Sequence, residues 1–242
     1  TMEYKFDFAT LTSITGYQTL DYTINQDAPI YIGFCGFGGF SCASAGVPNA
    51  NHVTKFTQEV RLTSNGNGPL QWILGGYYTH ESSNWYVAIH GYNAAGTQTG
   101  SVLDLNLPET FSEKAVFGDL TYHLTEKLEV TAGIRYFGTS NTIAQIGTGA
   151  FGSIAAPRTF NETAFTYLAN AAYHFSPNAT AYVRFSTGYR PGGPDIIVGT
   201  PLPNAPTSFK ADTLQSYEVG FKANTPDRKF GIDLSAYHIR WK

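Results

Sequence analysis

The chain alternates apolar and polar residues with a period of two over most of its length, a pattern that predicts β-strands. The alternating runs centre on Val60, Leu74, Leu120, Ile134, Tyr167, Val183 and Val219. Each run extends over roughly 11–14 residues, whereas strands of soluble proteins average five or six and a tilted membrane-crossing strand needs about 9–11. Strand length therefore favours strands that cross a membrane.

The alternation also predicts which side chains share a face. The seven central residues of the runs should point to lipid, and Glu59, Arg135, Arg184 and Glu218 should point to the interior of a barrel. Because side chains alternate strictly along a strand, an error of one residue in the register would reverse this assignment.

Two kinds of connection separate the runs. Short polar turns are predicted near 64–69, 125–127, 176–178 and 224–228, and long stretches rich in Gly, Asn, Ser and Pro lie near 25–52, 80–111, 139–161 and 188–210. Outer-membrane barrels have short periplasmic turns and long extracellular loops. The sequence therefore predicts an all-β, antiparallel transmembrane β-barrel with about ten strand segments.

Composition is consistent with a lipid-facing wall. Of 242 residues, 42% are hydrophobic, 15% are aromatic and only 14% are charged. No run approaches the ~18–20 apolar residues of a transmembrane helix, and a net charge of −3 excludes a strongly basic nucleic-acid binder. The alternation continues to the last residues, 237–242, so we expect the chain to be part of a larger barrel.

Two cysteines, Cys35 and Cys42, lie seven positions apart in the first long stretch. In an oxidising compartment they would form a disulfide that closes a small loop. Two unpaired thiols are the alternative, and a redox-active pair is disfavoured because such pairs usually have a two-residue spacing.

Several segments resemble the barrel of a TonB-dependent outer-membrane receptor. The resemblance rests on residues 11–17, 56–64, 72–78, 130–136, 185–193 and 216–222, in this order. It implies that residues 1–242 are part of one transmembrane β-barrel domain of about 22 strands, with the remaining strands and an N-terminal plug domain outside this chain.

The same resemblance implies a location in the bacterial outer membrane, in contact with its lipid. It further implies that a scarce small-molecule ligand, such as an iron–siderophore complex, is imported. A TonB-type energy-transducing complex would drive this import through the plug. No cofactor is implied.

Arginines on the interior face are the first candidate ligand contacts, because a guanidinium binds carboxylate or phosphate with paired hydrogen bonds. Arg190 lies at the top of its predicted strand, and Arg135 and Arg184 are predicted in the outer halves of theirs. The alternative for each is that it lines a wet interior and pairs with a neighbouring acid.

Aromatic residues of the long stretches are the second group. They are Trp85, Tyr86 and Tyr92, near His90, and Phe34, Phe37 and Phe40 near the cysteines. They could form an external surface that captures the ligand, or anchor the barrel at the membrane surface and pack within loops.

The sequence predicts no enzyme and no metal site, because it contains neither a catalytic elbow nor a His-Glu-x-x-His run. Three rival functions stay open. They are a passive porin-like channel, an outer-membrane enzyme or adhesin, and a soluble carbohydrate-binding protein.

Overall fold

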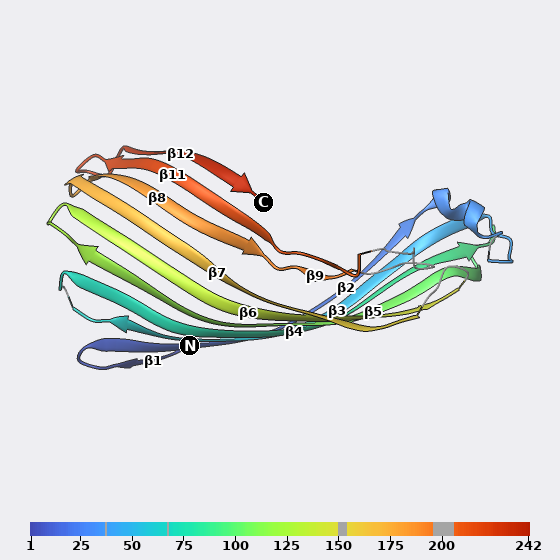
Figure 1. The fold of residues 1–242 in the computed structure, drawn as a ribbon. Coiled ribbons are helices and arrows are strands. Elements are labelled where there is room, and N and C mark those ends of the chain that lie inside the picture. Colours follow the sequence, from blue (N-terminus) through green and yellow to red (C-terminus); the bar gives the residue numbers. More distant parts are fainter. Residues whose placement is uncertain (37, 67, 150–153, 196–205) are drawn as a thin grey trace.

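A computed structural model describes residues 1–36, 38–66, 68–149, 154–195 and 206–242. Ten strands form one antiparallel sheet in the order β1-β2-β3-β4-β5-β6-β7-β8-β11-β12 (Figure 1). Their bounds are β1 (Met2–Lys5), β2 (Ala9–Asp27), β3 (Ser44–Ser64), β4 (Leu70–Tyr92), β5 (Gln98–His123), β6 (Leu128–Thr148), β7 (Ile154–Ser176), β8 (Ala179–Arg190), β11 (Asp212–Asn224) and β12 (Gly231–Trp241). The predicted antiparallel sheet of about ten strands is confirmed.

Three further elements are short. The 3-10 helix η1 (Pro29–Phe34) lies between β2 and β3, and β9 (Gly193–Pro194) pairs with β10 (Ser208–Phe209) between β8 and β11. Within the described residues, no helix is long and apolar enough to cross a membrane.

The strands β3 to β7 are longer than the sequence predicted. They contain 21 to 26 residues each, and only residues 93–97 connect β4 to β5. The stretches near 80–111 and 139–161, predicted as loops, therefore belong largely to paired strands. They were misread because the apolar residues change faces there, as the site geometry below shows.

The two ends of the sheet differ in their connections. The turns that follow β1, β3, β5, β7 and β11 all lie at one end, whereas η1 and the other connections lie at the opposite end (Figure 1). At the first end, the Thr125 hydroxyl accepts hydrogen bonds from the backbone N–H groups of Lys127 and Leu128, at 3.2 and 3.0 Å. The predicted short turns are confirmed.

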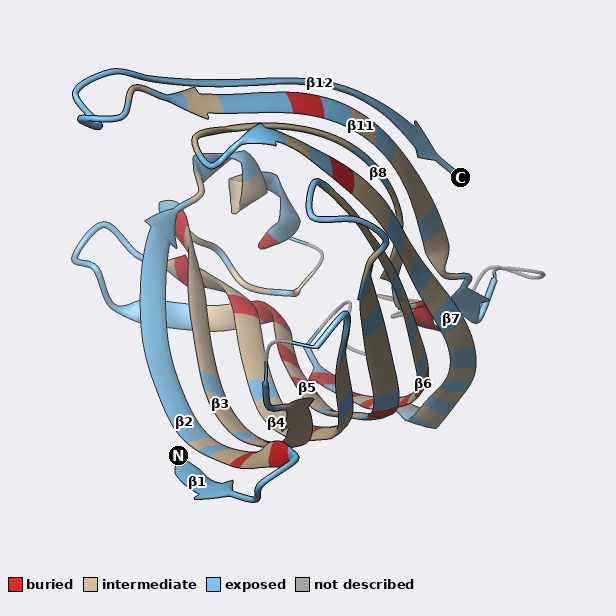
Figure 2. Ribbon diagram, turned by 90° about the vertical axis from the view of Figure 1, so that its left-hand side faces the viewer, coloured by how far each residue is buried: buried red, intermediate tan, exposed pale blue. Residues whose placement is uncertain are grey.

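The sheet curls into an open arc with a convex and a concave face (Figure 2). Val183 pairs with Val219 across β8 and β11, and the next pair along the ladder is Arg184 with Glu218. Alternation along the other strands extends this separation over the sheet. The residues predicted to face lipid are 42% to 60% exposed, namely Val60, Leu74, Leu120, Ile134, Tyr167, Val183 and Val219. They lie on the face opposite Glu59, Arg135, Arg184 and Glu218, so the predicted register is confirmed.

A belt of apolar side chains crosses the convex face. In β4 the apolar belt extends from Leu70 to Tyr78, about the nine to eleven residues that a tilted strand needs to cross a bilayer. Aromatic rings mark its margins: Trp72, Tyr122, Tyr173 and Phe221 toward the short turns, and Phe56, Tyr78, Tyr136 and Phe165 toward η1. We call the part of β3 to β7 beyond the belt on the η1 side the outer zone.

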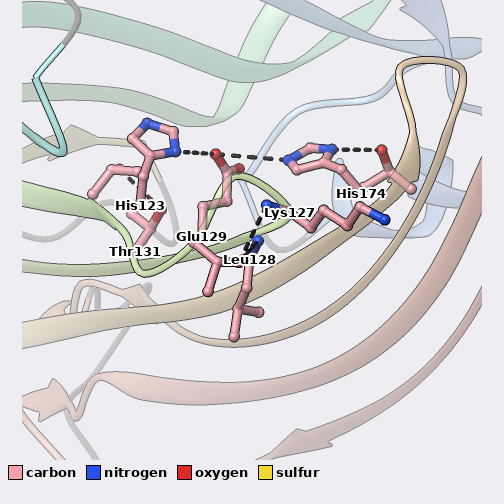
Figure 3. A network of polar contacts seen from close by, with 9 residues as sticks. His123, Lys127, Leu128, Glu129, Thr131 and His174 are labelled. Atoms are coloured by element: carbon pink, nitrogen blue, oxygen red, sulfur yellow. Dashed lines mark hydrogen bonds and ion pairs between the residues drawn. The ribbon is translucent and has the colours of Figure 1, made fainter.

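A polar network joins four strands on the concave face near the short turns (Figure 3). The Glu129 carboxylate lies 3.5 Å from Nδ1 of His123 on β5 and 3.8 Å from Nε2 of His174 on β7. Nδ1 of His174 is 2.9 Å from the Thr180 hydroxyl on β8. One carboxylate thus links neighbouring strands at the rim where the turns are shortest.

Candidate functional site

The concave face of the outer zone carries a packed group of apolar side chains, which we call the outer cluster. Its members are Leu103, Leu105, Leu107 and Ile143, with Trp85, Val87 and Ile89 packed against them. The four core members are 2% to 8% exposed. Cross-strand pairing of Trp85 with Leu107 and of Val87 with Leu105 places them on the same face as Arg135. In the outer zone a group of apolar side chains thus lies on the concave face, whereas within the belt the apolar side chains lie on the convex face.

Trp85 lies on β4, beside the outer cluster. Its indole N–H donates a hydrogen bond to Oδ1 of Asn49 on β3, at 2.7 Å. The prediction that Trp85 belongs to a loop is wrong, because β4 continues to Tyr92. Its side chain lies on the concave face, packed against the outer cluster.

Tyr86 points to the opposite, convex face and joins a polar group with His90 and Asp104. The Tyr86 hydroxyl donates to Oδ1 of Asp104 at 2.7 Å, and Nε2 of His90 lies 2.9 Å from the same oxygen. Partial burial raises the pKa of the Tyr86 phenol to about 12, and the Asp104 carboxylate adds to this. Burial would also raise the pKa of Asp104, but hydrogen bonds from His90 and Tyr86 outweigh it and hold that pKa below its ordinary value.

Tyr92 ends β4 on the same face as Tyr86. Its ring centroid is 6.5 Å from that of His90, and its edge lies close to the backbone of Gly46. Like Trp85, Tyr86 and Tyr92 lie on a strand, so their predicted place in a loop is also wrong. The three aromatic candidates therefore do not form one surface, because Trp85 faces inward and the two tyrosines face outward.

The segment around the cysteines folds over the end of the β4–β5 hairpin. Cys35 and Cys42 form a disulfide with an S–S distance of 2.01 Å. A Cβ atom at Gly91 would lie 2.6 Å from the Phe40 ring and 2.9 Å from Sγ of Cys35, and one at Gly100 would lie 2.5 Å from the Phe40 ring. Only glycine at this facing pair allows so close an approach. Phe34 contacts Tyr31, and Phe37 lies outside the described residues.

Arg135 is held on the concave face within the belt. Its guanidinium donates a 2.5 Å hydrogen bond to Oε1 of Glu113 and lies 5.1 Å from the Tyr77 ring centroid and 5.7 Å from that of Phe117. Contacts with one acid and two aromatic rings fix the position of this side chain.

Arg184 shares a hollow with Arg135. The hollow has a volume of about 270 Å³ and is lined on the concave side by Phe117, Asp119, Arg135, Leu168 and Arg184, among others. Within the described part of the chain, the Arg184 side chain has no hydrogen bond and no ion pair. It is therefore a cation free to bind an anionic group in the interior.

Arg135 and Arg184 do not lie in the outer halves of their strands, as the sequence predicted. Arg135 is the eighth of 21 residues in β6 and Arg184 the sixth of 12 in β8, both counted from the short turns. Arg135 lies nearer the short-turn end than predicted because β6 extends farther toward η1, and Arg184 lies at the middle of β8 rather than in its outer half. Arg190 ends β8 as predicted, pairs with Asp212 and lies 5.7 Å from the Trp241 ring centroid, apart from the hollow.

The segment after β8 crosses the concave face of β6 and β7. Glu162 on β7 accepts hydrogen bonds from the Tyr189 hydroxyl at 2.5 Å and from the backbone N–H of Gly192 at 3.1 Å. Nη1 of Arg158 donates to the carbonyl of Asp195 at 3.3 Å. β9 contacts both β6 and β7, so this segment narrows the interior.

Sequence reasoning missed three acids that organise these contacts: Asp104, Glu113 and Glu162. Tyr86 and His90 share a face at a spacing of four, which could have indicated a common partner. Nothing in the sequence marks Glu113 or Glu162, because their partners lie on other strands. Among the described residues, no group of three or more His, Cys, Asp and Glu side chains could hold a metal ion.

Comparisons with known proteins agree with this geometry. The family model described as TonB dependent receptor-like, beta-barrel matches residues 1–242. A pesticin receptor of Yersinia enterocolitica and one of Yersinia pestis are each 26% identical over 113 residues, which is 47% of this chain and 16% of theirs.

Two solved structures share the fold. The ferric yersiniabactin uptake receptor of Yersinia pestis matches with a TM-score of 0.79 and 19% identity, over 99% of this chain and 34% of that one. The ferric-catecholate import receptor of E. coli K12 in its closed form matches with a TM-score of 0.71 and 14% identity, over 98% and 39%. The chain thus spans about a third of the first structure.

Proposed function

Because the chain belongs to the TonB-dependent receptor-like β-barrel family of the bacterial outer membrane, we propose that it forms part of a receptor that binds a scarce ligand and imports it. The ligand class is a ferric siderophore or a similar chelate, and import is energy-coupled through TonB. The names of the related receptors support this class, since one takes up ferric yersiniabactin and another imports ferric catecholates.

The concave surface is the observation that carries the proposal. The outer cluster presents Trp85 among buried leucines, and farther toward the short turns Arg184 lies unpaired in a hollow beside Arg135. A siderophore complex combines rings or an apolar body with negative charge, and these two zones match both parts. A passive aqueous channel needs only a polar interior and gives no reason for an apolar one.

The proposal includes strands and a domain outside this chain. The sheet is an open arc, with β1 and β12 at its edges. Lipid offers no partner to unpaired backbone groups, so both edges need further strands. Residues 1–242 would then be part of one barrel of about 22 strands, and a plug domain within it would contact the TonB-type complex.

Six side chains were predicted to bind the ligand, and the geometry divides them. Arg184, Arg135 and Trp85 face the interior and remain in the proposal as ligand contacts. Arg190, Tyr86 and Tyr92 are engaged with neighbours outside the hollow. For these three we propose a role in shaping the wall.

The test is uptake of radioactive iron, supplied as a purified ferric siderophore, by cells that carry the native receptor. We expect saturable uptake that a protonophore abolishes. Arg184→Gln should weaken the apparent affinity for the ferric siderophore about tenfold, the effect of losing one charged contact. Lys222→Gln is the matched control, because Lys222 is a paired concave cation that does not line the hollow. Unsaturable uptake that is insensitive to the protonophore would show that the protein is a passive channel and not an energy-coupled receptor.

A further inference from the structure

Charged side chains are distributed very unevenly between the two faces of the sheet. In β3 to β8 and β11, alternation and cross-strand pairing place every Asp, Glu, Lys and Arg on the concave face except Asp104 and Lys114. Asp104 lies in the outer zone and is bonded to Tyr86 and His90. Lys114 is therefore the one charge of these strands on the convex face at the height of the apolar belt.

Lys114 lies at the margin of the belt that faces the outer zone. It pairs with Tyr78 on β4 and Gly138 on β6, and the next convex positions of β4, β5 and β6 toward the outer zone are the polar residues His80, Ser112 and Ser140. The side chain is exposed. Among the described residues it has neither a hydrogen bond nor an ion pair. A charge in this place lies at the level of the lipid headgroups.

A hollow of about 520 Å³ opens beside Lys114 on the same face. Besides Lys114, its lining is mostly apolar and aromatic: Val60, Gly76, Tyr77, Tyr78, Ala115, Val116 and Tyr136, with Gln58. A Cβ atom added at Gly76 would find no heavy atom closer than 3.8 Å. Gly76 therefore leaves open space between apolar and aromatic side chains, in the hollow that Lys114 also lines.

We propose that Lys114 binds the phosphate of an acylated, phosphorylated lipid of the outer leaflet, one acyl chain of which occupies this hollow. The ammonium supplies the charge for the phosphate, and the apolar walls supply the contacts for the chain. The inference requires only that the chain crosses the outer membrane with the outer zone outside. It does not depend on which ligand the receptor imports.

The experiment measures lipid binding to the native receptor, purified from outer membranes in a mild detergent, by native mass spectrometry. The probes are bisphosphorylated hexa-acyl lipid A, the same lipid without phosphate, and inorganic phosphate. We expect Lys114→Gln to bind the phosphorylated lipid about fivefold more weakly than the wild type, the effect of one basic residue at an anionic lipid surface. Lys114→Arg should bind it as the wild type does.

Two further variants separate charge from shape. Gly76→Leu fills the hollow without changing the charge and should weaken binding of both lipids. Lys55→Gln is the matched control, because Lys55 faces the interior and is paired with Glu81 at 3.2 Å, and it should bind lipid as the wild type does.

Three outcomes would overturn the proposal. They are equal binding of the phosphorylated lipid by the wild type and Lys114→Gln, equal binding of the two lipids by the wild type, and displacement of the lipid by millimolar inorganic phosphate. The last would indicate a site for free phosphate. Heat-modifiability on a denaturing gel verifies that each variant is a folded barrel.

Discussion

The apolar belt and the outer zone are built from the same strands but have opposite polarity. In the belt, β4 places Leu74 on the convex face and Tyr77 beside Arg135 on the concave face. In the outer zone the convex positions are polar, as at Ser82, and the concave positions hold Trp85 and its apolar neighbours. Pairing between β4 and β5 has no register shift before Ile89, so the sequence itself, and not a bulge, reverses the polarity.

The reversal shows that the medium outside the sheet decides which face is apolar. Facing lipid, the convex side must be apolar, and the interior is free to be polar. Facing water, the convex side is polar, and burial of apolar side chains on the concave face stabilises the paired strands. The outer zone therefore follows the rules of a soluble sheet, continuous with a transmembrane one.

The largest effect is expected from a cavity in the outer cluster. Leu105 is 3% exposed, so Leu105→Ala should lower the local unfolding free energy of the outer zone by about 2–5 kcal/mol. Hydrogen exchange of the β4 and β5 amides measures it. Asn106→Ala, one residue away on the convex face, should change exchange by less than about 0.5 kcal/mol. Equal losses in the two variants would contradict the assignment of faces.

A charge on the convex face distinguishes the two media. Leu120→Arg in the belt should destabilise the protein by about 2–4 kcal/mol in urea titrations in lipid vesicles. Thr110→Arg, on the same face of the same strand but in the outer zone, should change stability little because its side chain meets water. If both variants lose stability alike, lipid extends farther along the strands than the belt does.

Replacement of the two arginines that share a hollow should affect stability differently. Arg135 is bonded to Glu113 and stacked on two rings, so Arg135→Gln should lower the free energy of unfolding by about 1 kcal/mol. Arg184 has no such contacts, so Arg184→Gln should leave stability within about 0.5 kcal/mol while weakening ligand binding. Thermal unfolding with and without ligand checks both, and a stability loss at Arg184 would show a partner outside this chain.

The smallest effect is a dependence on pH that is confined to the outer zone. The folded chain raises the pKa of Tyr86 to about 12 from an ordinary value of about 10. The protonated Tyr86 phenol therefore stabilises the fold fully below pH about 10, and this stabilisation is lost as the pH rises to about 12. Hydrogen exchange of β4 at rising pH should show this loss in the wild type, and Tyr86→Phe should show none.

The sequence predicted the belt better than the outer zone for a physical reason. Val60 lies between Glu59 and Arg61, and Leu120 lies between Asp119 and Thr121. Because the lipid-facing side must be apolar, this pattern allows only one assignment of faces. Between residues 79 and 84 both faces of β4 are polar, which reads as a loop, and the alternation resumes at Trp85 in the opposite phase. The ligand site was predicted less well because Glu113 and Glu162 contact partners on other strands. These partners are 22 and 27 residues away in the sequence, so no local pattern indicates them.

The disulfide between Cys35 and Cys42 has a consequence for the order in which the protein is assembled. The two residues are seven positions apart and lie in one segment between β2 and β3, so their oxidation requires no strand to have paired. The oxidising compartment in which such bonds form lies between the cytosol and the outer membrane. The exported chain can therefore close this ring before insertion, and Phe40 can then dock on Gly91 and Gly100 once the β4–β5 hairpin forms. Trapping thiols in newly exported chains, before they resist protease, should find both cysteines already oxidised.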